Sequence, residues 1–389
     1  MQIRFFEDTN DKGLFPLTAT RPAAALRVGI LRISEKWALR LGTSKVGFQT
    51  RRYLQQRFPD LEADLNINGQ LLPDEQLIRA IENLPDNGVL ISAENICLVY
   101  KGNKSQEIKF DGKPLLIQRP FHIFKYNGRE IKIDFDLITA NRNSAPLSKT
   151  NTVIGEHAIF LEEGAQVECC ILNATAGPIY IGKNAQIMEG SMVRGPFSIG
   201  EGSNIKMGSK IYSDTTLGPY CNVGGEVNNV VFQGFSNKGH DGFLGNAVLG
   251  EWCNIGADTN ASNLKNTYDE VKVWNYSSNR FEKSGEQFCG LIMGDHSKCG
   301  INTMFNTGTV VGVGSNIFGS GFPRQFVPDF SWGGASGFVT HKLQQMEKTA
   351  QLMMQRRKRN YDSEEQDIIR SVFEQSQEYR SWERESESN

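Results

Sequence analysis

An aliphatic residue returns at every sixth position between residues 181 and 223. A second, mostly small residue follows each aliphatic one by four positions, and glycine often comes directly after it. A period of six fits neither an amphipathic helix nor an alternating strand, but it fits a coil of three flat faces, each built from one hexad. The pattern therefore predicts a parallel β-helix whose interior is filled by Ile181, Ile187, Val193, Ile199, Ile205, Ile211, Leu217 and Val223.

The hexads begin near Ile154, and two segments interrupt them before they resume at Met293. The first interruption spans residues 228–243, with the sequence NNVVFQGFSNKGHDGF, and the second is the polar span 263–290. Because long loops that leave a regular coil often carry function, we expect both segments to project from the β-helix.

The segments on either side lack this period. Residues 1–145 read as a mixed α/β domain, with a strand near residues 2–6, helices near 34–42 and 73–84, and a connector that ends in a helix. The last part has apolar residues at helical spacing, and its basic run, residues 356–359, reads as a solvated helix end. We therefore expect an α/β domain over 1–145, a β-helix over 146–330 and a C-terminal helical extension over 331–389.

Composition narrows the class of protein. The chain has 389 residues and a net charge of −2, which argues against a role dominated by nucleic acid or a membrane surface. It contains no long apolar segment that could span a bilayer, and its amino terminus does not read as a signal peptide. A cytoplasmic enzyme or scaffold is the expectation.

The residues around the first interruption suggest chemistry. A histidine lies in the glycine-flanked loop 239–242, and lysines and asparagines lie close to it in the sequence. Such groups suit acyl transfer, because histidine can take a proton at cellular pH, cations hold phosphate, and amides orient an acceptor. The candidates are His240, Lys238, Asn254, Asn263 and Lys265.

The stretches 236–245, 249–257 and 263–265 resemble the acetyltransferase domain of the bifunctional N-acetylglucosamine-1-phosphate uridylyltransferase and glucosamine-1-phosphate acetyltransferase family. The resemblance implies a left-handed β-helix, acetyl-CoA as a substrate, and a homotrimer with active sites between neighbouring β-helices. By this match His240 is the acetyl-transfer base, and Asn254, Asn263 and Lys265 bind the acceptor. Phe243 stands where the family has a tyrosine, and Lys206, Lys210 and Lys238 are the candidates for holding the sugar phosphate.

Pro16-Leu17-Thr18, Arg21-Pro22 and Val28-Gly29 are similar to the amino-terminal motif of sugar-phosphate nucleotidyltransferases. The resemblance implies a nucleotide-like pocket at Thr18, Arg21, Pro22 and Gly69. The loop 7–13, however, is acidic, which suits phosphate poorly, and Ala23 and Gln70 stand where the family has a lysine and a metal-binding acid. We expect Mg²⁺ to be needed only if nucleotidyl transfer is retained, and no other metal site.

Three functions follow from these observations. The first is an acetyl-CoA-dependent acetyltransferase that acts on an amino-sugar phosphate or a nucleotide sugar, in sugar-nucleotide or cell-envelope biosynthesis. The second is a sugar-1-phosphate nucleotidyltransferase that uses UTP or dTTP and has a regulatory β-helix. The third is a non-catalytic trimeric scaffold that binds sugar.

Overall fold

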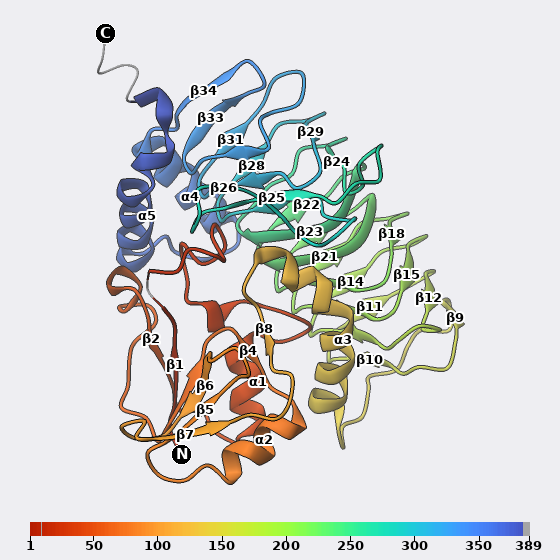
Figure 1. The fold of residues 1–389 in the computed structure, drawn as a ribbon. Helices are drawn as coiled ribbons and strands as arrows, with labels where there is room; N and C mark the ends of the chain where they lie inside the picture. The colour runs from red at the N-terminus through yellow and green to blue at the C-terminus, as the bar shows by residue number, and fades with distance from the viewer. Residues whose placement is uncertain (9, 384–389) are drawn as a thin grey trace.

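The computed structural model describes residues 1–8 and 10–383. It contains an N-terminal α/β domain, a left-handed parallel β-helix and C-terminal helices, which confirms the fold class expected from the sequence (Figure 1). The end of the expected C-terminal extension, residues 384–389, lies outside the described residues.

The N-terminal domain is built on a six-stranded mixed sheet in the order β2-β1-β3-β6-β5-β7. Apolar side chains from the sheet pack against helices α1 (Ile33–Arg40) and α2 (Glu75–Glu82), the two helices that the sequence predicts. A short pair, β4 (Leu71–Leu72) and β8 (Leu115–Leu116), lies outside this sheet. The strands of the six-stranded sheet are β1 (Ile3–Phe6), β2 (Val46–Gln49), β3 (Leu65–Asn68), β5 (Gly88–Ile91), β6 (Cys97–Tyr100) and β7 (Gln106–Lys109).

The long helix α3 (Pro120–Thr139) joins the two domains and packs along one face of the β-helix. Within the helix, Asn127 donates from Nδ2 to the carbonyl of Asp214 at 2.7 Å. The buried ammonium of Lys36 lies between two α3 carboxylates, 2.9 Å from Glu130 and 2.5 Å from Asp134. The domain and the β-helix are therefore joined by polar contacts as well as by apolar packing.

The coils stack in parallel, and the hexad residues of one coil register with those of the next, as with Ile187 and Ile205. The aliphatic residues of the hexads fill a single continuous core.

The strands of the coils stack into three faces, numbered here 1 to 3. Face 1 contains β9 (Thr152–Ile154), β12 (Ile171–Asn173), β15 (Met192–Arg194), β18 (Lys210–Ile211), β24 (Asn260–Ala261) and β29 (Met304–Phe305). Face 2 contains β10 (Ile159–Leu161), β13 (Ile179–Ile181), β16 (Phe197–Ile199), β19 (Thr215–Leu217), β27 (Ile292–Met293), β30 (Val310–Val311) and β32 (Phe326–Val327). Face 3 contains β11 (Gln166–Val167), β14 (Gln186–Ile187), β17 (Asn204–Ile205), β20 (Asn222–Val223), β22 (Asn237–Lys238), β28 (Lys298–Cys299), β31 (Asn316–Ile317) and β33 (Ser331–Gly334).

The first interruption does not project from the β-helix, so that prediction is wrong. In this coil and the next, faces 1 and 2 merge into the nine-residue strands β21 (Glu226–Gly234) and β23 (Phe243–Glu251), which pair in parallel. The merged coil is shorter than its neighbours, and this shortening breaks the six-residue period while the stack stays intact. The loop at His240 is therefore a corner of a regular coil.

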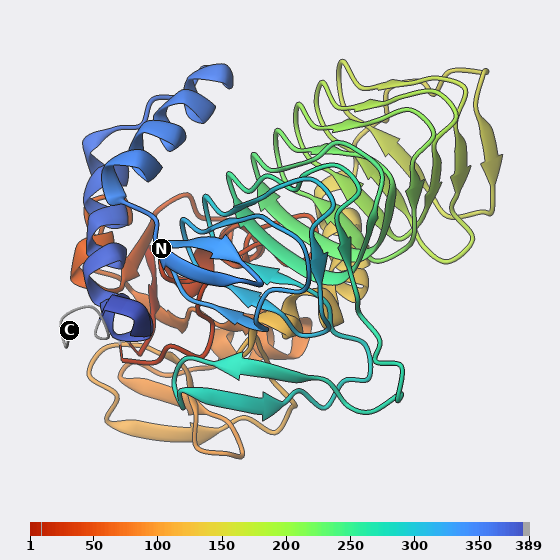
Figure 2. The ribbon, with the colours of Figure 1, turned by 90° about the horizontal axis from the view of Figure 1, so that it is seen from above.

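The second interruption does project, as predicted. It contains the hairpin β25 (Lys272–Asn275) and β26 (Arg280–Lys283), which leaves the coils and lies beside the N-terminal domain (Figure 2). The hairpin reaches the acidic loop, because Ser277 Oγ donates to Asp11 Oδ1 at 2.9 Å and accepts from the backbone amide of Lys12. The hairpin thus contacts the acidic loop 7–13 of the N-terminal domain.

The last coil ends in strand β34 (Gly337–Thr340), which pairs antiparallel with β33. Helices α4 (Leu343–Arg356) and α5 (Ser363–Gln375) follow, and they pack in one apolar cluster with Val313 and Phe330 of the coils and Ala19 and Leu54 of the N-terminal domain. None of the described helices is long and apolar enough to cross a membrane.

Candidate functional site

His240 lines an open pocket of about 550 Å³ between face 3 of the β-helix and the end of α4. It follows β22 and Gly239 at a coil corner, and its side chain is exposed. The structure thus places the imidazole at the surface of a concavity, in reach of solvent and of a bound molecule. Asn254, the second residue of the sequence-based site in this region, lines the same pocket.

A ladder of asparagine amides forms one side of this pocket. Successive coils place Asn204, Asn222, Asn237 and Asn254 in register on face 3. The side-chain amides hydrogen-bond to one another along the stack, at 3.0, 2.9 and 3.4 Å. Three of the four line the pocket, which gives it fixed donors and acceptors of the kind that bind hydroxyl and amide groups.

Cationic side chains lie beside this ladder. Arg356 and Arg357, from the last turn of α4, line the pocket together with Lys206 from the coils. Arg357 donates to the carbonyl of Tyr220 at 3.0 Å and to Oδ1 of Asn237 at 2.6 Å. The prediction that the basic run is a solvated helix end is therefore wrong for Arg357, because the α4–α5 segment folds back onto the coil corner.

The fold-back is held by a stack of aromatic rings along the corner between faces 2 and 3, at the other end of face 3 from His240. The rings of Tyr220 and Phe235 lie 5.3 Å apart, and those of Phe235 and Trp252 lie 4.4 Å apart. All three residues have positive φ, so the turn of each coil projects its ring in the same direction. The guanidinium of Arg359 lies over Tyr220 and Phe235, and this cation–π contact fixes the chain just after Arg357.

Lys238 does not line the pocket in the described structure. It registers with Val223, whose side chain is in the interior of the preceding coil, and its ammonium donates to the carbonyls of Gly224 at 3.0 Å and His240 at 2.8 Å. Burial lowers the pKa of this ammonium to about 8. Lys238 therefore holds the backbone of the His240 corner from inside the coil.

The other three acceptor-binding candidates lie away from this pocket. Asn263 donates to Asn246 Oδ1 at 2.7 Å, and Lys265 donates to the carbonyl of Glu270 at 2.7 Å within the inserted segment. The backbone amide of Phe243 donates to Asn260 at the start of β23. Within one chain, then, the structure brings together His240 and Asn254 but not Phe243, Asn263 and Lys265.

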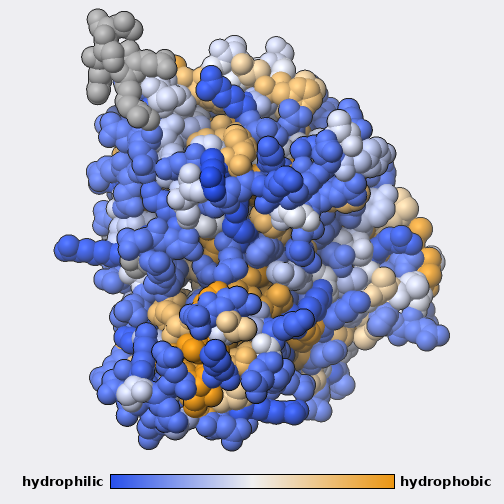
Figure 3. Space-filling model, in the orientation of Figure 1, coloured by the Kyte–Doolittle hydropathy of each residue, from blue (hydrophilic) through white to orange (hydrophobic). Residues whose placement is uncertain are grey.

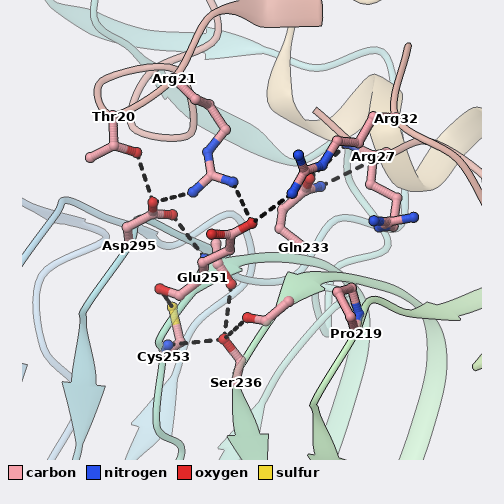
Figure 4. A network of polar contacts seen from close by, with 12 residues as sticks. Thr20, Arg21, Arg27, Arg32, Pro219, Gln233, Ser236, Glu251, Cys253 and Asp295 are labelled. Atoms are coloured by element: carbon pink, nitrogen blue, oxygen red, sulfur yellow. Dashed lines mark hydrogen bonds and ion pairs between the residues drawn. The ribbon is translucent and has the colours of Figure 1, made fainter. Parts of the chain in front are cut away.

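Arg21 of the nucleotidyltransferase-like motif belongs to a buried ion-pair network between the two domains (Figure 4). Its guanidinium is ion-paired with Asp295 and lies 2.8 Å from Glu251, and Thr20 donates to Asp295 at 2.7 Å. Burial opposes ionisation of Glu251, but Arg21 and Arg32 outweigh it and hold the pKa of this carboxyl well below its usual value. Arg21 is thereby committed to the domain interface.

A carboxylate occupies the place of an anion in the nucleotidyltransferase-like domain. Glu7 accepts a hydrogen bond from the backbone amide of Ala23, at 2.9 Å, where the 3₁₀ turn Ala23–Ala25 begins. It also accepts from Thr50 and lies 3.5 Å from Arg51, and burial raises the pKa of its carboxyl. The backbone amide that follows the Arg-Pro motif is therefore already satisfied by the protein itself.

The remaining residues predicted for the nucleotide-like pocket make backbone contacts or turns near Glu7. Thr18 is buried, and its carbonyl accepts from Arg51 at 3.3 Å. Pro22 directly precedes the 3₁₀ turn, and the amide of Gly69 donates to the carbonyl of Phe6 at 2.8 Å. Gln70 lies beside an acid, 3.4 Å from Asp11 Oδ2. Among the described residues, no group of three histidine, cysteine or acidic side chains has the geometry to hold a metal ion.

Comparison with known proteins finds a family match for the first part of the chain. Residues 3–143 match a family model described as sugar nucleotidyl transferase. No curated protein matches the chain significantly.

Solved structures of two acetyltransferases are similar to part of the chain. The polySia specific acetyltransferase NeuO is 12% identical over 50% of this chain and 87% of its own, with a TM-score of 0.26. The polysialic acid O-acetyltransferase OatWY is 14% identical over 49% of this chain and 88% of its own, with a TM-score of 0.25. A likeness this distant defines neither substrate nor reaction. From the family match and the fold, the chain is a sugar nucleotidyltransferase-like domain followed by a left-handed parallel β-helix, the arrangement that its resemblance to the bifunctional family implies.

Proposed function

We propose that this protein transfers the acetyl group of acetyl-CoA to an amino-sugar phosphate or a nucleotide sugar, in the pocket that contains His240. The observation that carries this proposal is the position of an exposed imidazole beside an amide ladder and a cationic wall in one concavity. The sugar nucleotidyl transferase match supports a sugar-related transferase, and the β-helix supplies the rigid scaffold.

In the proposed reaction, the amine or hydroxyl of the acceptor attacks the thioester carbonyl while His240 takes its proton. The new carbon–nitrogen or carbon–oxygen bond forms, and the carbon–sulfur bond of the thioester breaks. The departing thiolate of CoA receives a proton from the imidazolium, which restores His240. Asn237 and Asn254 orient the acceptor through its hydroxyl or amide groups.

A homotrimer is part of this proposal. Face 2 is covered by α3, whereas the outer side of face 1 exposes a row of large apolar residues in the first coils: Ile154, Ile171, Met192 and Tyr212. Figure 3 shows apolar surface at the edge where these coils lie in Figure 1. Contact between copies would cover this row and bring a neighbour's Asn263 region toward His240.

The alternative, nucleotidyl transfer with UTP or dTTP, has less support. Arg21 is held by two carboxylates of the β-helix, and Glu7 fills the anion position of the domain. A nucleotide phosphate would have to displace both sets of contacts.

The test is release of CoA from acetyl-CoA with a panel of amino-sugar phosphates and nucleotide sugars. We expect turnover with at least one acceptor, and a loss of roughly a hundredfold or more for His240→Ala and His240→Asn. The matched control is His157→Ala, because His157 is also exposed on the β-helix but lies in its first coil, and this variant should keep full activity. A folded His240→Ala variant with full activity would show that His240 is not the base.

A further inference from the structure

We propose that Arg356 and Arg357, with Lys206, form a binding site for a phosphate group, so that the C-terminal extension completes the His240 pocket. This inference deepens the proposed function and rests on it for the choice of ligands. It starts from an imbalance of charge that the protein itself does not neutralise.

The positive charge of Arg357 is not paired with an acidic side chain among the described residues. Its two terminal nitrogens bind a backbone carbonyl, that of Tyr220, and a neutral amide, that of Asn237. Burial lowers the pKa of its guanidinium, which reports that the charged form lacks compensation by an acid. The two contacts hold the side chain in place, so an anion that binds there meets a preorganised fork.

The surroundings offer no anion. Among the described residues, Lys206, Arg356 and Arg357 form no ion pair, and no aspartate or glutamate lines the pocket. A neighbouring crevice shows the contrast, because acids line it as well as arginines: Arg21 faces Glu251, and Arg57 is ion-paired with Glu365. Of these two crevices, both bordered by the C-terminal segment, the one with His240 has cationic side chains without acidic ones in its lining and therefore carries net positive charge.

The ligand that complements such a site is an anion with several oxygens. A phosphate matches the planar fork of arginine through paired hydrogen bonds, and two arginines with a lysine balance one phosphate dianion or a pyrophosphate. Arg357 binds Asn237 of the amide ladder, and Lys206 lies in the same column of the coils as Gly239, next to His240, so the rest of the ligand would reach along polar groups to the base. Two substrates could supply the phosphate: the acceptor sugar phosphate and acetyl-CoA.

Calorimetric titration of the full chain separates these sources without turnover. The probes are CoA, pantetheine, glucosamine-1-phosphate and glucosamine, and both Arg357→Ala and Arg356→Ala are measured. Each substitution should weaken binding of one phosphorylated probe by about tenfold or more and leave its unphosphorylated counterpart unchanged. Arg357→Lys should recover part of the loss. Because Arg356 makes no described side-chain contact, its variant tests the site even if Arg357→Ala unfolds.

The control is Lys348→Ala, which removes one positive charge from an exposed position on α4 and should leave both affinities unchanged. Weaker binding of CoA alone assigns the site to the donor, and weaker binding of glucosamine-1-phosphate alone assigns it to the acceptor. Unchanged binding of both in the two arginine variants overturns the inference. If phosphate binding depends on these arginines but no acceptor releases CoA, the proposed reaction fails while the site stands.

Discussion

Replacing Arg21 with methionine tests whether this residue joins the domains or binds a nucleotide. The Arg21 side chain is 8% exposed, and its two partners, Glu251 and Asp295, are 16% and 4% exposed. Methionine keeps most of the length of the side chain and its packing but removes the charge. The two carboxylates would then share a buried interface without their main cation.

The expected loss is large. Removing one partner of a buried ion pair costs about 3–5 kcal/mol, because the remaining charge stays buried and unpaired. The pKa of Glu251 leads to a similar magnitude. Although burial raises it, the nearby arginines lower it from 4.5 to about 2, which corresponds to about 3 kcal/mol of favourable interaction with the ionised form.

Urea unfolding at several pH values measures both the size and the sign of this effect. Because the folded-state pKa of Glu251 lies below the usual value, its contribution is present above about pH 4.5 and is lost as the pH falls toward 2. The difference between wild type and Arg21→Met should therefore be largest near neutral pH and should narrow through this window. Arg79→Met is the control, because Arg79 is 77% exposed and pairs only with Glu75 of its own helix; we expect a change under about 0.5 kcal/mol.

A loss below about 1 kcal/mol for Arg21→Met, with an acid profile like that of the wild type, would refute the interface role. If the variant instead kept its stability and lost affinity for UTP or dTTP, Arg21 would be a nucleotide ligand, as the resemblance first implied.

Three further outcomes are expected. Pyrophosphate release from UTP or dTTP with a sugar-1-phosphate and Mg²⁺ should stay far below about 1 per second, because Glu7 already fills the anion position; typical enzyme rates would contradict this. Light scattering should give the mass of a trimer at micromolar concentration, and Met192→Glu should shift it toward the monomer by placing a charge on face 1, whereas a monomeric wild type would rule out the assembly. Deletion after Phe330 should cause aggregation, because it uncovers the β31 edge and the apolar cluster with Val313 and Leu54; an equally stable, monodisperse truncation would count against it.

The β-helix could be predicted from the sequence, because a hexad is a local repeat and each aliphatic residue meets the equivalent residue of the next coil. It also located α1, α2 and the helix in the connector, because the apolar spacing of each helix lies within one segment. The projecting second interruption followed from the same pattern, since a long polar span cannot enter the interior of a coil.

The shortened coil changes the spacing between equivalent residues, which sequence counting does not show. Lys238 registers with Val223 although only 15 residues separate them, whereas unbroken hexads place equivalent residues 18 apart, as with Ile205 and Val223. Strict counting therefore could not reveal that Lys238 points into the coil. Only the pairing of β21 with β18 and β19 of the preceding coil, a tertiary contact, set that register.

Tertiary structure alone decided the partners of the charged residues. Arg21 meets carboxylates more than two hundred positions away, and Arg357 meets Asn237 across 120 positions. The identity of an arginine fixes its charge and reach, but the burial and the counter-ion that decide its role come from segments brought together by folding. For this reason the motif predicted a nucleotide ligand at Arg21 and a solvated helix end at Arg357, while the fold made the first an interface residue and placed the second in the His240 pocket.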